Sequence, residues 1–157
     1  MKIEVGQTAP SFTLFNTEKQ EIALESLRGR NVLIHFFPLA FTSVCTAQLC
    51  NARDNMEMYT KLNCTVLGIS VDSLFSLAEF KKQQNLSFDL LSDFNKTVIK
   101  QFGVEIPEFA FGMQGVSNRA AFVIDAEGVV RYAEVCPNPG EQPNYTAIEH
   151  AIKQLGN

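Results

Sequence analysis

The chain has 157 residues, of which 46% are hydrophobic and 19% charged, so we expect residues 1–157 to form one globular domain. The formal net charge is −4, and no run of Lys or Arg is longer than two, which argues against nucleic acid and acidic membrane surfaces as partners. No apolar stretch approaches the roughly 18 residues of a membrane helix, and residues 1–5 do not resemble a signal-peptide core. We therefore expect a cytoplasmic protein that does not enter membranes.

Apolar runs rich in β-branched residues predict strands at 32–37, 65–71, 120–125 and 129–135, with a shorter candidate at 88–91. Helices are expected at about 43–61, 74–84, 96–102 and 145–155. Residues 125–128, which end in Gly128, predict a hairpin turn with a positive φ, whereas residues 103–118 predict a long loop or a short helical insert. The order of the elements indicates an α/β fold with a mixed central sheet flanked by helices.

The first expected helix has one buried stripe and an opposite polar face. The stripe repeats at helical spacing and consists of Cys45, Leu49, Ala52, Met56 and Tyr59. Cys45 opens the stripe in the first turn, while Cys50 lies about 140° away, on the polar face.

Structural disulfides are rare in cytosolic proteins. The four cysteines can therefore be interpreted as buried thiols, as a metal site or as residues of redox catalysis. Zinc sites use clustered ligands in closely spaced pairs. Apart from Cys45 and Cys50, the candidate ligands stand singly in this chain: Cys64, Cys136, His35 and His150. We therefore expect neither a metal nor another cofactor.

Cys45 stands where a thiolate is stabilised, since it follows a strand and a short apolar loop and begins a helix. Thr42, three residues earlier, is a neighbour on the first turn, so its hydroxyl can donate to the sulfur and accept from a small polar molecule bound beside it. Arg119 directly precedes an apolar run, and a buried cation needs an anion, either the Cys45 thiolate or a carboxylate at the sheet edge. Without these neighbours, Cys45 would be interpreted as an inert packed thiol.

The segment from Pro38 to Cys45, Pro-Leu-Ala-Phe-Thr-Ser-Val-Cys, resembles the Pro-x-x-x-Thr/Ser-x-x-Cys signature of the peroxiredoxins, the alkyl hydroperoxide reductase / thiol-specific antioxidant family. The similarity extends to residues 6–14, 31–37, 67–72, 92–93 and 119–125. It implies a thioredoxin-like fold with an N-terminal extension. It also implies a thiol-dependent peroxidase that acts on hydrogen peroxide and organic hydroperoxides, uses thioredoxin or a similar dithiol as reductant, and is a monomer or homodimer.

The resemblance also implies roles for individual residues. Cys45 matches the peroxidatic cysteine, Thr42 the hydroxyl that orients the peroxide, and Pro38 the residue that shields the pocket. Arg119 matches the guanidinium that stabilises the thiolate and the developing negative charge. Gln48 matches a position where the family often has Glu or Gln that holds the arginine, with a solvated helix residue as the alternative.

Cys50 follows Cys45 by five residues, which resembles the bacterioferritin-comigratory-protein type of peroxiredoxin, with its resolving cysteine on the same helix. An intact helix would keep the two Cα atoms about 8 Å apart, and a disulfide requires less than about 7 Å, so an intrachain disulfide would require the helix to unwind. Cys136 is the alternative resolving cysteine, within the chain or across a dimer, and an external thiol is the third possibility. Cys50 could also be a structural thiol, and Cys64 is expected in the core.

Two other functions fit the same fold. A thiol–disulfide oxidoreductase would require Cys-x-x-Cys, which this chain lacks. A chaperone-like or interaction protein would have no reason to combine Thr42, Cys45 and Arg119. The residues therefore favour the peroxidase, and a peroxide-consumption assay separates the three functions.

Overall fold

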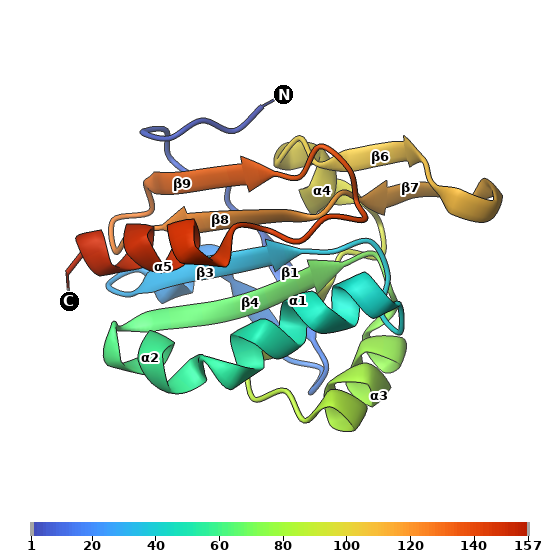
Figure 1. The fold of residues 1–157 in the computed structure, drawn as a ribbon, viewed down its shortest axis with the longest axis horizontal. Coiled ribbons are helices and arrows are strands. Elements are labelled where there is room, and N and C mark those ends of the chain that lie inside the picture. The colour runs from blue at the N-terminus through green and yellow to red at the C-terminus, as the bar shows by residue number, and fades with distance from the viewer. Residues whose placement is uncertain (1, 157) are drawn as a thin grey trace.

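A computed structural model of the chain, which describes residues 2–156, contains a seven-stranded mixed sheet with helices on both faces (Figure 1). The elements in chain order are β1 (Thr13–Asn16), β2 (Glu21–Ala23), η1 (Leu24–Leu27), β3 (Asn31–Phe36), α1 (Ser43–Asp54), α2 (Met56–Lys61), β4 (Cys64–Ser70), α3 (Leu74–Gln84), β5 (Asp89–Ser92), α4 (Thr97–Gln101), β6 (Glu105–Glu108), η2 (Ala110–Gly112), β7 (Gln114–Ser117), β8 (Ala120–Ile124), β9 (Val130–Val135) and α5 (Tyr145–Gln154).

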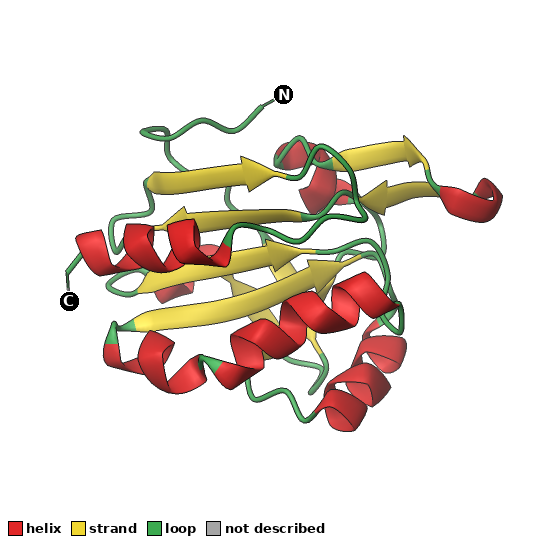
Figure 2. Cartoon of the chain, viewed as in Figure 1, coloured by secondary structure: helices red, strands yellow, loops and turns green. Residues whose placement is uncertain are grey.

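The sheet has the strand order β2-β1-β5-β4-β3-β8-β9. Strands β3, β4 and β5 are parallel, whereas β8 runs antiparallel to β3, β9 antiparallel to β8, and β1 antiparallel to β5. Figure 2 shows this layer of strands with α1, α2 and α5 across its near face. The mixed sheet flanked by helices that the sequence predicts is confirmed.

The central strand β3 separates two apolar cores, because successive side chains of a strand point to opposite faces. Leu33 packs with Leu49 of α1 and Ile148 of α5 in one core. Ile34 packs in the other core, together with Ile99 of α4. All five side chains are fully buried, and burial of each contributes about 1.5–3 kcal/mol. The helix α1, which carries Cys45, packs against the face of the sheet to which Leu33 points.

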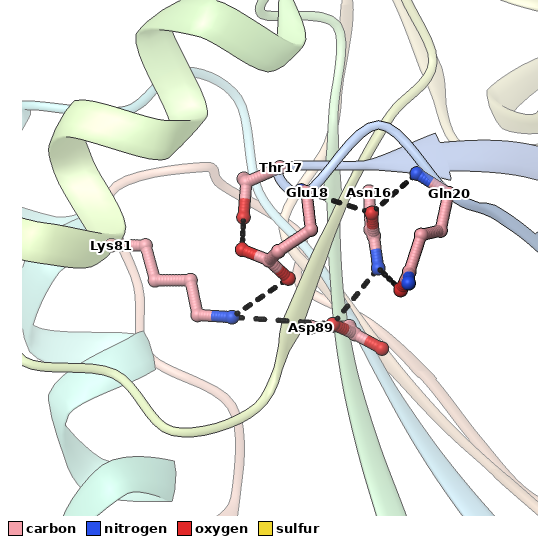
Figure 3. A network of polar contacts seen from close by, with 6 residues as sticks. All are labelled: Asn16, Thr17, Glu18, Gln20, Lys81 and Asp89. Carbon is pink, nitrogen blue, oxygen red and sulfur yellow. Dashed lines mark hydrogen bonds and ion pairs between the residues drawn. The ribbon is translucent and has the colours of Figure 1, made fainter.

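A polar network fixes the β1–β2 hairpin (Figure 3). The sequence pattern did not predict this hairpin, because the family resemblance implied only an N-terminal extension. The buried Asn16 side chain accepts from the backbone N–H groups of Glu18 and Gln20 at 3.0 and 2.9 Å, and donates to Asp89 of β5 at 3.3 Å. Lys81 of α3 lies 3.5 Å from Glu18 and 4.0 Å from Asp89. The network therefore joins the N-terminal extension to both α3 and β5.

The single helix expected over residues 43–61 is wrong, because the chain breaks at Asn55 into α1 and α2. Asn55 has φ −113° and ψ 13°, and its side chain donates to the carbonyl of Asn51 at 2.7 Å. Such local side-chain hydrogen bonds compete with regular helix geometry. The buried stripe continues past the break, since Ala52 and Tyr59 are both fully buried.

The loop or helical insert expected over residues 103–118 is also wrong, since this segment forms the β6–β7 hairpin with the short turn η2 at its tip. Glu105 pairs with Ser117 and Ile106 with Val116. Each strand has only four residues, and Pro107 interrupts the first, so the alternation was too short to recognise.

The other expected strands and helices are confirmed to within two residues at each end. The hairpin turn between β8 and β9 is confirmed as well, because Gly128 has φ +87° and its N–H donates to the carbonyl of Asp125 at 3.0 Å. Within residues 2–156, no helix is long and apolar enough to cross a membrane.

Candidate active site

The loop from Pro38 to Thr42 connects β3 to α1 and is held at two points. The N–H of Ala40 donates to Asp72 Oδ2 at 2.9 Å, and the Ser70 hydroxyl donates to the same oxygen at 2.6 Å. Phe41 has φ +68°, and its ring packs edge-on against Phe80 of α3 with the centroids 5.3 Å apart. Because β4 and α3 fix the loop, its position relative to the first turn of α1 is defined.

Cys45 lies in the first turn of α1, where backbone N–H groups have no acceptor within the helix. The residue is fully buried, and it lines a pocket of about 180 Å³. The lining also includes Pro38, Thr42, Phe109 and Arg119. Because a water molecule takes up about 30 Å³ of liquid, the pocket has room for a small hydroperoxide group.

Arg119 immediately precedes β8 and is 2% exposed. Its Nη1 donates to Cys45 Sγ at 3.2 Å and to Gln48 Oε1 at 2.9 Å, while Nε donates to the carbonyl of Pro139 at 2.9 Å. None of the ion pairs within residues 2–156 involves Arg119. Of the two anions considered from the sequence, the structure therefore brings the Cys45 sulfur to this cation.

Gln48 is fully buried, so its interpretation as a solvated helix residue is wrong. Its Oε1 accepts from Arg119, and its Nε2 lies 2.9 Å from His35 Nδ1 and 3.3 Å from the carbonyl of Phe36. Sequence reasoning did not place His35 in the site. Its position on β3, between Leu33 and Phe37 on the α1 face, was the available signal.

Thr42 and Pro38 both line the pocket. The Thr42 hydroxyl donates to the carbonyl of Leu39 at 2.8 Å, so the expected donation to the sulfur is not the arrangement found. Its oxygen keeps lone pairs that can accept a hydrogen bond. Pro38 is buried and covers one side of the pocket.

Comparison with known proteins identifies the family, because the AhpC/TSA family matches residues 5–133. The chain belongs to the AhpC/TSA family, as a peroxiredoxin of the Bcp type. A bcp-type homologue from Coxiella burnetii is 42% identical over 83% of this chain and 87% of its own length. Peroxiredoxin Bcp of Escherichia coli is 37% identical over 83% of this chain and 84% of its own length. Family membership makes the chain a thiol-dependent peroxidase.

Solved structures show the same fold. The peroxiredoxin-like protein from Aquifex aeolicus has a TM-score of 0.88 and 28% identity, with 99% of this chain and 89% of that chain covered. Peroxidoxin BcpB from Mycobacterium tuberculosis has a TM-score of 0.86 and 25% identity, with 99% of both chains covered. The thioredoxin-like fold expected of this peroxiredoxin is confirmed.

Cys50 of the peroxiredoxin is half-buried against α3 and does not lie on a freely solvated face. Its Sγ donates to Gln84 Oε1 at 3.5 Å, and Arg53 Nη1 donates to the carbonyl of the same Gln84 at 2.8 Å. Because α1 is continuous from Ser43 to Asp54, helix geometry keeps the Cα atoms of Cys45 and Cys50 about 8 Å apart. Both thiols are free.

The other two cysteines of the peroxiredoxin are buried. Burial raises the pKa of Cys64 to about 12, and burial together with the nearby Glu134 carboxylate raises the pKa of Cys136 to about 11. Both are therefore protonated at neutral pH and weakly nucleophilic. The core position expected for Cys64 is confirmed, while Cys136 lies beside the site, with its N–H donating to the carbonyl of Arg119 at 2.9 Å.

Proposed function

We propose that Cys45 is the nucleophile of this peroxidase and that hydrogen peroxide and organic hydroperoxides react in the pocket above it. The observation that carries the proposal is the 3.2 Å contact between Arg119 Nη1 and Cys45 Sγ. A fully buried thiolate requires a compensating charge, and the guanidinium supplies it together with the N-terminal end of α1.

In the first step, the Cys45 thiolate attacks one oxygen of the hydroperoxide. An S–O bond forms and the O–O bond breaks, so Cys45 becomes a sulfenic acid and the leaving oxygen departs as an alkoxide, or as hydroxide from hydrogen peroxide, which takes a proton from solvent to become an alcohol or water. Negative charge moves from sulfur to the leaving oxygen. Arg119 is placed to stabilise this charge, because its donors are fixed before the reaction by Gln48 and Pro139.

Thr42 and Pro38 orient the peroxide and shield it. The Thr42 hydroxyl donates to Leu39, so its oxygen is free to accept the hydrogen bond of the hydroperoxide O–H. Pro38 has no N–H and presents an apolar ring to the pocket, which limits the access of water.

In the second step, Cys50 attacks the sulfenic sulfur of Cys45. A disulfide forms and one water leaves, so the pair has taken up two oxidising equivalents from the peroxide. The sulfurs meet only if the first turns of α1 open and Cys50 leaves Gln84. Each hydrogen bond lost costs about 0.5–1.5 kcal/mol net. Helix ends fray readily, so the loss of a few such bonds is accessible.

A dithiol reductant of the thioredoxin type then returns both cysteines to thiols by disulfide exchange. Four free thiols fit a reducing compartment such as the cytoplasm. Cys45, Gln48, Arg119 and Cys50 all come from one chain, so the cycle can run in a monomer and equally in a homodimer.

The test measures peroxide-dependent oxidation of reduced thioredoxin by wild type and by Cys45→Ser. We expect the variant to fold and to lose catalytic turnover, while the matched variant Cys64→Ser retains it. Turnover by purified Cys45→Ser close to that of wild type would refute the proposal.

A further inference from the structure

A continuous line of buried hydrogen bonds leads from β3 to the sulfur of Cys45. His35 Nδ1 lies 2.9 Å from Gln48 Nε2, Gln48 Oε1 lies 2.9 Å from Arg119 Nη1, and the same nitrogen lies 3.2 Å from Cys45 Sγ. His35, Gln48 and Cys45 are fully buried, and Arg119 is 2% exposed. His35 does not line the pocket, and Gln48 is the residue that joins it to Arg119.

The direction of each hydrogen bond follows from the chemistry of the groups. A guanidinium has only donors, so the amide oxygen of Gln48 must face Arg119. The amide nitrogen of Gln48 therefore faces His35, and Nδ1 of the imidazole has to accept. A neutral imidazole that accepts at Nδ1 carries its proton on Nε2.

We propose that His35 is a positioning residue of the peroxidase: as a neutral, Nε2-protonated imidazole it fixes the amide orientation of Gln48, which in turn holds the Arg119 guanidinium on the Cys45 sulfur. The inference rests on the proposed role of Cys45. It adds a residue on the strand beneath the site that acts without touching substrate.

The surroundings of His35 favour the neutral imidazole. Leu33 and Phe37 flank it on the same face of the strand, and the Tyr145 ring of α5 packs with its centroid 6.4 Å away. Burial lowers the pKa of His35 to about 4. An imidazolium would donate from Nδ1 toward the Gln48 amide nitrogen, itself a donor, and would break the line of hydrogen bonds.

Gln48 has one other acceptor for its amide nitrogen, the carbonyl of Phe36 at 3.3 Å. That contact satisfies one of the two amide hydrogens. Without His35 the second hydrogen would remain buried and unpaired, which favours rotation of the amide away from its present plane. Arg119 Nη1 would then lose the oxygen that fixes it beside the sulfur.

The test compares single-turnover rate constants for hydrogen peroxide in His35→Leu, His35→Asn and Gln48→Ala. Asn places its Oδ1 near the position of Nδ1 and restores the acceptor. We expect His35→Leu to slow the Cys45 reaction about tenfold and His35→Asn to recover most of that loss. In the Gln48→Ala background, His35→Leu should cause no further loss beyond about twofold.

Leu33→Ala is the matched control, because it opens a cavity two residues away on the same face of β3 without touching the hydrogen bonds. Its thermal midpoint should fall, while its rate constant stays within about twofold of wild type. A wild-type rate in His35→Leu, equal slowing in His35→Leu and His35→Asn, or a full additional loss in the Gln48→Ala background would each overturn the inference.

A measurement on the unaltered protein keeps the inference testable if His35→Leu does not fold. Imidazole nitrogen NMR at neutral pH should show His35 protonated on Nε2, and protonation on Nδ1 would overturn the inference. Reaction of Cys45→Ser with peroxide at the wild-type rate would instead refute the proposed function. The two failures are therefore distinguishable.

Discussion

Arg119 Nη1 lies 3.2 Å from Cys45 Sγ, although 74 residues separate the two along the chain. The register of the sheet explains the contact. Phe36, the last residue of β3, pairs with Ala120, the first residue of β8, in an antiparallel ladder. The residue before β8 and the loop after β3 therefore meet at one edge, where α1 begins.

Replacement of this cation should slow the chemical step. We expect Arg119→Met to lower the rate constant for hydrogen peroxide about 100-fold, because a preorganised donor is lost where negative charge develops. Arg119→Lys keeps a charge but loses the fork that contacts Cys45, Gln48 and Pro139 together, and should be intermediate. Stopped-flow peroxide kinetics measure both variants, and an unchanged rate for Arg119→Met would rule out a direct role.

Removal of the resolving thiol should separate the two steps. Cys50→Ser should react once with peroxide, accumulate the sulfenic acid of Cys45, overoxidise more readily and lose thioredoxin-linked turnover. Cys136→Ser is the matched control and should turn over normally. If Cys136→Ser stalls and Cys50→Ser does not, Cys136 is the resolving cysteine. If neither stalls, an external thiol resolves the enzyme.

Oxidation should open α1 locally. Hydrogen exchange by mass spectrometry should show faster exchange over about residues 46–54 in the disulfide form than in the reduced form, because Cys50 must leave Gln84 and the first turns must unwind. Oxidised Cys50→Ser should keep the protection of the reduced protein. Equal protection of α1 in the reduced and disulfide forms would contradict the proposed opening.

The buried imidazole of His35 should make the fold sensitive to acid. Its pKa is lowered by burial from 6.5 to about 4, so the unfolded chain takes up a proton first as the pH falls. The free energy of unfolding should be fully retained above pH 6.5 and should fall by about 3 kcal/mol between pH 6.5 and about 4. Urea unfolding at several pH values measures this loss. His35→Asn has no titrating group at this position, so its free energy of unfolding should lack the part of the fall that is due to His35. An equal fall in both proteins would contradict the assignment.

The sequence was sufficient for those features that depend on local pattern. The β-branched runs predict the core strands, the i, i+4 spacing from Cys45 predicts the buried face of α1, and Gly128 predicts the turn between β8 and β9. The family signature adds Thr42 and Pro38 to the site. These features require only neighbours along one element.

Features that depend on contacts between distant segments could not be predicted in the same way. The burial of Gln48 follows from its contacts with His35 on β3 and with Arg119, which directly precedes β8. The half-burial of Cys50 depends on Gln84 at the end of α3. Only the pairing of β3 with β8 and the packing of α1 and α3 bring these residues together.

Trapping of the first oxidised intermediate tests the central assignment most directly. Reduced protein is mixed with one equivalent of hydrogen peroxide in the presence of dimedone, which reacts with sulfenic acids, and the adduct is located by peptide mass spectrometry. The account predicts the adduct on Cys45, with a higher yield in Cys50→Ser because no second thiol competes for the sulfenic acid. An adduct confined to Cys50, Cys64 or Cys136, with Cys45 left as a thiol, would contradict it.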